Sequence, residues 1–343
     1  AVSCYQKAIA INPNILGAHN NLGLVFRTLN DPKNAIICYK KAIQIKPDNA
    51  GTHHNLALVY KELGDFSEAI KSHETAIKYE PENYSHYFYL SDLKKNIIDS
   101  KLITKIKKNI KNEKITNGNK AFGNYLLAKY EKNNKNYKKE LDYLKDAHKF
   151  FFELKKNKFE LGIKYCFDDV LQISKNINVN IANNKTDNKI KPIFIVGVPR
   201  CGSTLLEKMI ASGKNFIPMG EETSIFENYV NKKILETKSV DLGDVNERRE
   251  ELNEIYKEKG LISKKNNYTF TDKSLNNFFY LNLIKQIYPD AKVINCKRDI
   301  LSSIMSIFQN NLSELAWTHN LDNIFSYFDN YFKIIENFTK DNS

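Results

Sequence analysis

The residues best suited to chemistry lie in a glycine-containing loop, GVPRCGSTLL, at positions 197–206. Gly197, four residues, Gly202 and two hydroxyl residues reproduce the spacing of a nucleotide phosphate-binding loop, except that Ser203 replaces the lysine. Backbone N–H groups and the helix dipole attract an anion where a strand leads through such a loop into a helix. The missing lysine, Arg200 within the loop and the lack of a convincing acidic strand end for magnesium disfavour triphosphate hydrolysis. A phosphosulfate anhydride, which needs no metal, fits better; the alternative is a turn that only ends a strand.

The elements around this loop predict an α/β domain. PIFIVGVP (192–199) is a short, β-branched, apolar run, typical of a buried parallel strand, and TLLEKMIAS (204–212) has a helical pattern. The pair AKVINCKRD (291–299) and ILSSIMSIFQNNL (300–312) follows the same order. Two strand–loop–helix units predict a P-loop-like fold with a parallel sheet.

The first hundred residues contain an internal repeat. Pro13, Pro47 and Pro81 end three copies of one phrase at a spacing of 34 residues. This period, with small residues at helix crossings, resembles the tetratricopeptide repeat, a helix–turn–helix unit. Such helix pairs bury their apolar stripes by stacking, so we predict an α-helical solenoid whose concave face suits a peptide. Polar residues fall at first-helix positions, where they either pack or line the groove: His19, Asn20, His53 and Asn55.

Three parts are predicted along the chain. Residues 1–118 form the repeat array, which starts within a repeat; residues 119–188 supply additional helices and a linker; and residues 189–343 form the α/β domain. The chain opens without Met in a helical pattern and stops inside or just after another helix. We therefore expect a fragment with an incomplete α/β domain and weak or no activity.

Composition restricts the class of protein. The net charge is +12, much of it from lysines alternating with Asn and Ile, as in 95–115. This pattern is typical of a solvated helix surface; polyanion binding is the alternative, and no aromatic-interleaved basic motif indicates nucleic acid. Five scattered cysteines without C-x-x-C spacing indicate neither a zinc site nor a disulfide framework, and favour a reducing, cytoplasmic compartment. No apolar run is long enough to span a bilayer.

Four motifs together carry a family resemblance. The loop GVPRCGSTLL is similar to the 5′-phosphosulfate loop of sulfotransferases that use 3′-phosphoadenosine 5′-phosphosulfate (PAPS), and CKRDILSSIMSIFQN (296–310) to their 3′-phosphate motif. With the repeats, the chain resembles the tetratricopeptide-repeat sulfotransferases. GEET (220–223) and DKS (272–274) also resemble the tyrosylprotein sulfotransferases.

The resemblance implies a nucleotide site. It places around the 5′-phosphosulfate the loop residues Arg200, Cys201, Gly202, Ser203 and Thr204. Arg298 and Ser306 would bind the 3′-phosphate, and an eight-residue spacing returns a helix to a similar face. The alternative for Arg298 is a surface ion pair with Asp299. The relatives carry a further Arg where this chain has Asn310, so we expect one phosphate contact fewer.

The resemblance also implies the catalytic groups. There is no His between Pro192 and Asn311, so a carboxylate is expected as the base. Glu222 aligns with the base of the relatives, and one inserted residue leaves Glu221 a rival; the alternative is an acidic helix start. Lys273, together with Arg200, would stabilise the leaving oxygen, unless it is a solvated lysine.

These features predict a sulfotransferase that moves sulfate from PAPS to a hydroxyl acceptor without a metal. The acceptor is a protein tyrosine, a carbohydrate or a small alcohol, and the repeats either bind a peptide or protein partner or mediate self-association. A non-catalytic repeat scaffold with a nucleotide-binding remnant is the alternative from another class. A nucleotide kinase is disfavoured by Ser203.

Overall fold

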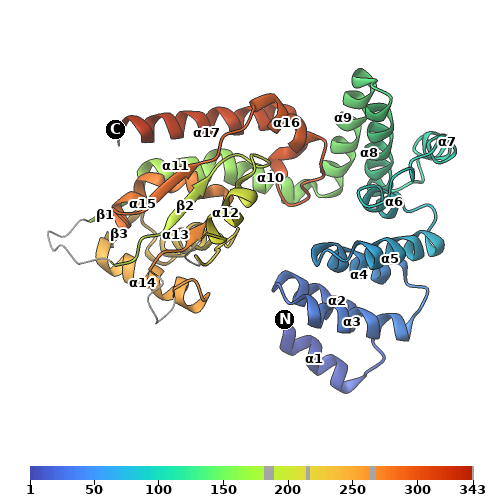
Figure 1. Ribbon diagram of the computed structural model, residues 1–343, viewed down its shortest axis with the longest axis horizontal. Coiled ribbons are helices and arrows are strands. Elements are labelled where there is room, and N and C mark those ends of the chain that lie inside the picture. Colours follow the sequence, from blue (N-terminus) through green and yellow to red (C-terminus); the bar gives the residue numbers. More distant parts are fainter. Residues whose placement is uncertain (181–188, 214–216, 263–267, 342–343) are drawn as a thin grey trace. The chain divides into compact units, whose positions relative to one another are not determined.

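The computed structural model describes residues 1–180, 189–213, 217–262 and 268–341. They fold as two units, Ala1–Leu154 and Lys155–Ser343 (Figure 1). The first unit is helical, and the second holds parallel strands with helices around them. The predicted fold class, a helical repeat region followed by an α/β domain with a parallel sheet, is confirmed.

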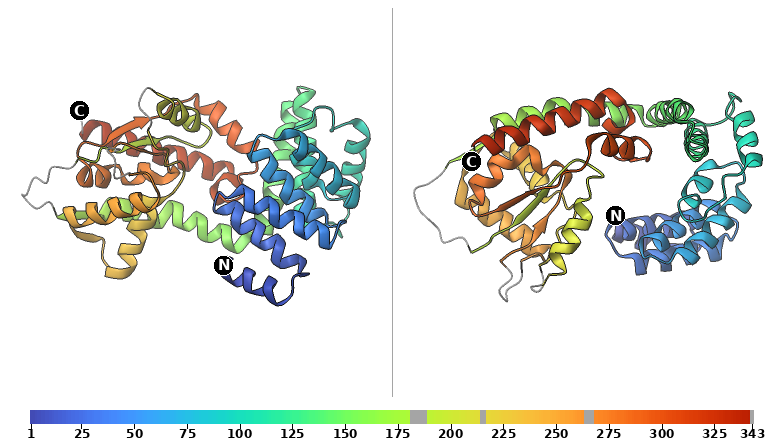
Figure 2. Two further views of the ribbon diagram at one scale, coloured as in Figure 1. Left: turned by 60° about the horizontal axis from the view of Figure 1, so that its bottom comes forward. Right: turned by 45° about the horizontal axis from the view of Figure 1, so that its top comes forward.

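The first unit is a series of stacked helices. Within it, α2 packs on α3, α4 on α5 and α8 on α9, while α3 contacts α4 and α5 contacts α6 (Figure 2). Side chains of Asp31, Asn49 and Asp65 cap the helices that follow them. The helices are α1 (Val2–Ile11), α2 (Leu16–Thr28), α3 (Pro32–Ile45), α4 (Ala50–Glu62), α5 (Phe66–Tyr79), α6 (Tyr84–Leu90), α7 (Ser100–Asn109), α8 (Asn117–Asn133) and α9 (Tyr137–Leu154).

One contact recurs at the same position in each repeat. The side chain at this position bonds the carbonyl of the proline six residues earlier, and so closes the turn between two helices. The pairs are His19 Nε2 with Pro13 O (2.9 Å), His53 Nε2 with Pro47 O (2.8 Å) and Tyr87 Oη with Pro81 O (3.3 Å). Between first helices, Asn55 Nδ2 donates to Asn20 Oδ1 at 3.1 Å. His19 and His53 therefore hold the repeat together.

Three histidines gather between α4, α5 and α6. The ring of His54 lies 5.2 Å from that of His73 and 5.1 Å from that of His86. Burial, reinforced by the neighbouring rings, lowers the pKa of His54 to about 3, and burial lowers the pKa of His73 to about 4. Within the described residues, neither ring nitrogen of His73 has a hydrogen-bond partner. The cluster is therefore built for neutral rings.

The second unit is organised by a three-stranded parallel sheet in the order β4-β2-β5. Phe194 lies opposite Asp272 on one side, and Val196 lies opposite Asn295 on the other. The strands predicted within 192–199 and 291–299 are thus confirmed. The bounds are β1 (Asn178–Asn180), β2 (Ile193–Val196), β3 (Asp241–Asp244), β4 (Thr271–Asp272) and β5 (Lys292–Asn295), and β1 pairs in parallel with β3. The start of the predicted loop at 178–191 is therefore a short strand, and 181–188 lies outside the described residues.

Helices surround this sheet. All four residues of β2 are buried, and the helix predicted after the glycine loop is α12. The α-helices are α10 (Lys156–Lys164), α11 (Val170–Asn176), α12 (Ser203–Ala211), α13 (Ile225–Thr237), α14 (Val245–Glu258), α15 (Leu281–Ile287), α16 (Ile300–Phe308) and α17 (Leu321–Asp341). A π-helical turn, η1 (Tyr165–Asp169), and two 3₁₀ turns, η2 (Leu275–Tyr280) and η3 (Ala316–His319), complete them.

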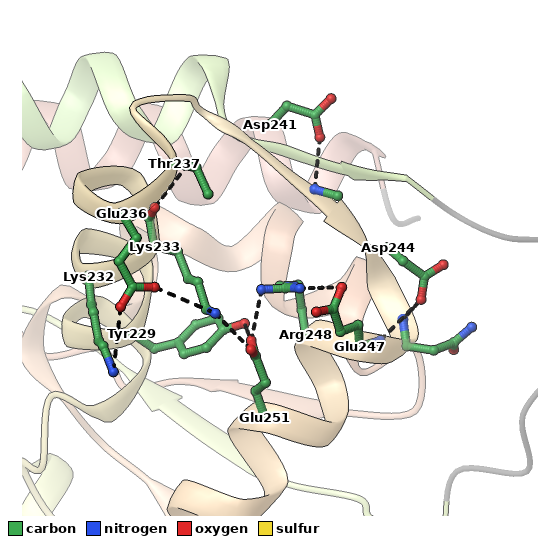
Figure 3. A network of polar contacts seen from close by, with 12 residues as sticks. Tyr229, Lys232, Lys233, Glu236, Thr237, Asp241, Asp244, Glu247, Arg248 and Glu251 are labelled. Atoms are coloured by element: carbon green, nitrogen blue, oxygen red, sulfur yellow. Dashed lines mark hydrogen bonds and ion pairs between the residues drawn. The ribbon is translucent and has the colours of Figure 1, made fainter.

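A polar network holds α13 against α14 (Figure 3). The carboxylate of Glu251 accepts hydrogen bonds from Tyr229 Oη, from Lys233 Nζ at 2.7 Å and from Arg248 Nη1 at 2.9 Å. Although burial opposes it, donation by Lys233 and Tyr229 lowers the pKa of Glu251. Both helices border the site described below, so this network stabilises the packing of the two helices that support the site.

Acid should destabilise the repeat unit. Because His54 and His73 have lowered pKa values, the unfolded state binds more protons between about pH 4 and pH 6.5. Stability from these rings is fully present above about pH 6.5 and is lost as the pH falls toward 4. We expect the thermal midpoint of helix loss, followed by circular dichroism, to drop by several degrees from pH 7.5 to pH 5. His73→Phe, which removes one titrating ring, should drop less; an equal drop would exclude the cluster as the cause.

Candidate functional site

The glycine loop joins β2 to α12. Gly202 has φ +100° and is the N-terminal cap of α12, and Arg200 also lies in the left-handed region at φ +69°. A Cβ on Gly197 would stand 2.6 Å from Cys201 Sγ and 2.9 Å from Cys296 O, so this position requires glycine. The strand–loop–helix arrangement predicted for an anion site is therefore present.

The two predicted anion-binding motifs meet at Arg200. Its Nε donates to Ser306 Oγ at 3.1 Å, and its carbonyl accepts from Arg298 Nη1 at 3.0 Å. Arg200 and Arg298 are both exposed. The expectation that Arg298 and Ser306 share one helix face is wrong, because α16 begins at Ile300, after Arg298. Arg298 and Ser306 instead come together because both contact Arg200 in the glycine loop.

Two other polar residues of the segment 296–310, Asp299 and Asn310, already have hydrogen-bond partners. The Asp299 carboxylate caps α16 by accepting from Ser302 N at 2.7 Å. Hydrogen bonds from the side chain and from the backbone of Ser302 lower the pKa of Asp299. Asn310 Nδ2 donates to the carbonyl of Ser306 at 2.6 Å. The amide that replaces the relatives' additional arginine is thus bonded to its own helix.

The loop also packs on the end of β5 through two cysteines. Cys201 is buried, and Cys296 Sγ lies 3.5 Å from Cys201 O. Burial, together with the neighbouring Cys201 thiol, raises the pKa of the Cys296 thiol to about 11. The Cys296 thiol therefore stays protonated at neutral pH, and the buried Cys201 side chain is a small packing group.

The candidate catalytic groups meet on the other side of β2. Lys273 is only 6% exposed, and its Nζ lies 3.0 Å from Glu222 Oε1. Lys273 is therefore not a solvated lysine. Glu221 contributes its backbone here, because its carbonyl accepts from Lys273 N at 3.1 Å. Both glutamates precede α13, whose N-terminal cap is Ser224, so they lie outside its first turn.

A buried carboxylate that sequence reasoning missed forms this corner. Asp272 is fully buried; its Oδ1 accepts from Ser274 N (3.0 Å), Ser274 Oγ (2.6 Å) and Asn277 Nδ2 (2.8 Å), and its Oδ2 from Tyr256 Oη (2.9 Å). Ser274 Oγ in turn accepts from Ser224 N at 2.9 Å. Asp272 is the first residue of the DKS motif (272–274), but the sequence predicted a function only for Lys273.

The segment before Glu222 runs beside β4 like a further strand. Thr271 N donates to Pro218 O at 3.0 Å, and Met219 forms a parallel bridge with Thr271. A Cβ on Gly220 would collide with the carbonyl oxygen of Thr271. Glycine at 220 is therefore required for the close approach that brings Glu222 to Lys273.

The described residues contain neither a metal-binding cluster of side chains nor a membrane-spanning helix. No three side chains of His, Cys, Asp or Glu are arranged there to hold a metal ion. No helix in the described part of the chain is both long enough and apolar enough to cross a membrane.

Comparison with known proteins agrees with the two-part organisation. Residues 192–341 match the sequence model described as "Sulfotransferase family", 25–64 match "TPR repeat" and 50–83 match "Tetratricopeptide repeat". An uncharacterized protein of Aquifex aeolicus (strain VF5) is 29% identical over 132 residues, which are 36% of this chain and 17% of that protein. The chain thus matches only about a sixth of the length of that relative.

Two solved structures are also similar. The crystal structure of MamA is 19% identical and covers 46% of this chain and 89% of that chain, with a TM-score of 0.32. The crystal structure of YrrB, described as a TPR protein with an unusual peptide-binding site, is 17% identical and covers 46% and 86% respectively, also with a TM-score of 0.32.

Gly220→Ala should damage this corner. The added methyl meets a backbone carbonyl that cannot rotate away, so we expect a loss of about 1–3 kcal/mol in the free energy of unfolding. Chemical denaturation measures this loss. Gly17→Ala is the matched control, because nothing lies within 4 Å of its added Cβ. Equal stability of the two variants would contradict the packing argument.

Proposed function

Because the chain joins tetratricopeptide repeats to a sulfotransferase-family domain, we propose that it transfers the sulfuryl group of PAPS to a hydroxyl acceptor. The observation that carries this proposal is the convergence of Arg200, Ser306 and Arg298 at a glycine loop without the triphosphate-binding lysine. Two guanidinium groups and a hydroxyl suit a phosphate, because each charged hydrogen bond contributes about 1.5–3 kcal/mol.

The nucleotide would be held at two points. Arg298 and Ser306 take the 3′-phosphate. The 5′-phosphosulfate lies against the start of α12, where backbone N–H groups and hydroxyls come from Arg200, Cys201, Gly202, Ser203 and Thr204. Ser306 already accepts a hydrogen bond from Arg200, so the two points are coupled before any nucleotide binds.

Transfer needs one base and one electrostatic stabiliser. Glu222 accepts the proton of the acceptor hydroxyl while that oxygen forms a bond to sulfur. The bond from sulfur to the bridging oxygen breaks at the same time, and Lys273 with Arg200 stabilises the charge on the departing phosphate. The 3.0 Å contact of Lys273 with Glu222 supports this pair over Glu221, whose backbone is the part that meets Lys273. No metal is needed, because these cations carry the charge stabilisation.

The acceptor is a protein tyrosine, a carbohydrate or a small alcohol. The repeats support a protein or peptide partner, because stacked helix pairs form an extended surface. We assign them acceptor selection or partner binding, and we assign the chemistry to the second unit.

Arg298→Ala should weaken nucleotide binding. Loss of the charged phosphate contact is expected to reduce the affinity for 3′,5′-bisphosphoadenosine by about 1.5–3 kcal/mol in calorimetry. Lys297→Ala removes an adjacent exposed charge and should change the affinity far less. A parallel titration with ATP tests a kinase-like site. Unchanged affinity in Arg298→Ala, or tighter binding of ATP, would overturn the assignment.

Glu222→Gln should slow transfer without changing nucleotide affinity. A general base contributes roughly 10²–10⁴-fold, so we expect a loss of that size in the release of bisphosphoadenosine from PAPS with phenol, tyrosine-peptide and hexose acceptors. Glu221→Gln, one residue away, is the control. If it loses transfer while Glu222→Gln does not, Glu221 is the base. Nucleotide binding without release of bisphosphoadenosine, both in this chain and in longer versions of it, would favour a non-catalytic scaffold.

A further inference from the structure

A second buried carboxylate lies between the glycine loop and the catalytic corner. Glu207, on α12, is only 1% exposed and interrupts the apolar pattern of STLLEKMIA. Its Oε1 accepts from Thr271 Oγ1 at 2.6 Å and from Glu221 N at 3.1 Å. Burying an ionisable group costs several kcal/mol, and an apolar residue of similar volume is often more stable. Glu207 is thus a costly choice for a position that only fills the core.

The two bonds of Glu207 lead to the two proposed catalytic side chains. Thr271 lies in β4, two residues before Lys273, and Glu221 directly precedes Glu222. Gly220 N also lies 3.3 Å from Thr271 Oγ1, so this hydroxyl accepts from one segment and donates to Glu207. One carboxylate oxygen therefore joins α12, β4 and the segment before α13.

The backbone at Glu221 shows why this link is needed. Glu221 has φ +48°, a left-handed conformation that costs a side-chain-bearing residue about 1 kcal/mol or more. The turn directs the side chain of Glu222 to Lys273, and the bond from Glu221 N to Glu207 holds the turn in place. Without this acceptor, the amide would have to find another partner, and the turn could relax to a more extended backbone.

We propose that Glu207 is a positioning residue for sulfuryl transfer. This assignment rests on the proposed function. It does not touch the reacting groups. It fixes Glu222 and Lys273 relative to each other and to α12, the helix whose first turn binds the phosphosulfate. Displacement of a catalytic group by about 1 Å can cost about 10²-fold in rate, so the link acts on turnover more than on binding.

The test uses the full chain with two kinds of variant. Glu207→Met keeps the length of the side chain and removes both acceptor oxygens, whereas Glu207→Gln retains one acceptor oxygen for the two bonds and is its control. Thr271→Val removes the hydroxyl, and Thr271→Ser retains it. With PAPS and the phenol and tyrosine-peptide acceptors, we expect kcat to fall about 10²-fold in Glu207→Met and by a smaller factor in Thr271→Val. The KM for PAPS and the affinity for 3′,5′-bisphosphoadenosine should stay within about threefold of wild type. Glu207→Gln and Thr271→Ser should retain most of the turnover, and the double variant Glu207→Met, Thr271→Val should be no slower than Glu207→Met, since one link is broken twice.

Three outcomes would overturn the proposal. They are wild-type kcat in Glu207→Met, a loss of nucleotide affinity as large as the loss of kcat, and strictly additive effects in the double variant. If Glu207→Met does not fold, the Thr271→Val and Thr271→Ser pair decides, and equal kcat in that pair would contradict the proposal.

Hydrogen exchange tests the link without any turnover. Peptides covering residues 217–224 should exchange faster in Glu207→Met and in Thr271→Val than in wild type, while peptides from β2 stay unchanged. If neither this chain nor longer versions of it transfer sulfate, the proposed function fails, but this comparison still tests the link. Identical exchange of 217–224 in all three proteins would remove Glu207 from its assigned role.

Discussion

The geometry of the candidate site depends on the buried carboxylate of Asp272. A fully buried acid is tolerated only where donors surround it, and Asp272 receives them from its own turn, from η2 and from Tyr256 on α14. Burial, together with Asp272, raises the pKa of Tyr256 well above its usual value, so this phenol remains a donor. The turn fixed in this way places Lys273 at the end of β4, and the network of Glu251 supports α14 from the other side.

The repeats, the two principal strands and the glycine loop could be predicted because their signals are local. Each depends on residues within one period or one strand–loop–helix unit, and the relevant physics is apolar spacing, proline and glycine. The proline-contacting histidines show the same point. Their equivalent positions in the repeat left packing and groove lining both open, and the structure shows that His19 and His53 bond carbonyls only six residues away.

The buried acids could not be predicted, because their partners are distant in sequence. Glu207 meets Thr271 across 64 positions, and nothing near Glu207 indicates that contact. A single acid in an apolar helix pattern is the only local sign. Arg298 and Ser306 do not share a helix face for a different reason, because Arg298 precedes α16, which begins at Ile300 as predicted. Spacing gives a shared face only when both residues are helical.

The charges around the glycine loop give a physical reason why it has Ser203 in place of the usual lysine. Arg298 donates to the carbonyl of Arg200, and the guanidinium of Arg200 donates to Ser306. Two positively charged groups are therefore held at one short segment. These groups repel each other, and in the proposed complex a phosphate would offset that repulsion by accepting their hydrogen bonds. A lysine at position 203 would add a third charge at the start of α12, which suits a triphosphate with its metal. Ser203 instead leaves a neutral donor there, so the proposed site discriminates by charge as well as by shape.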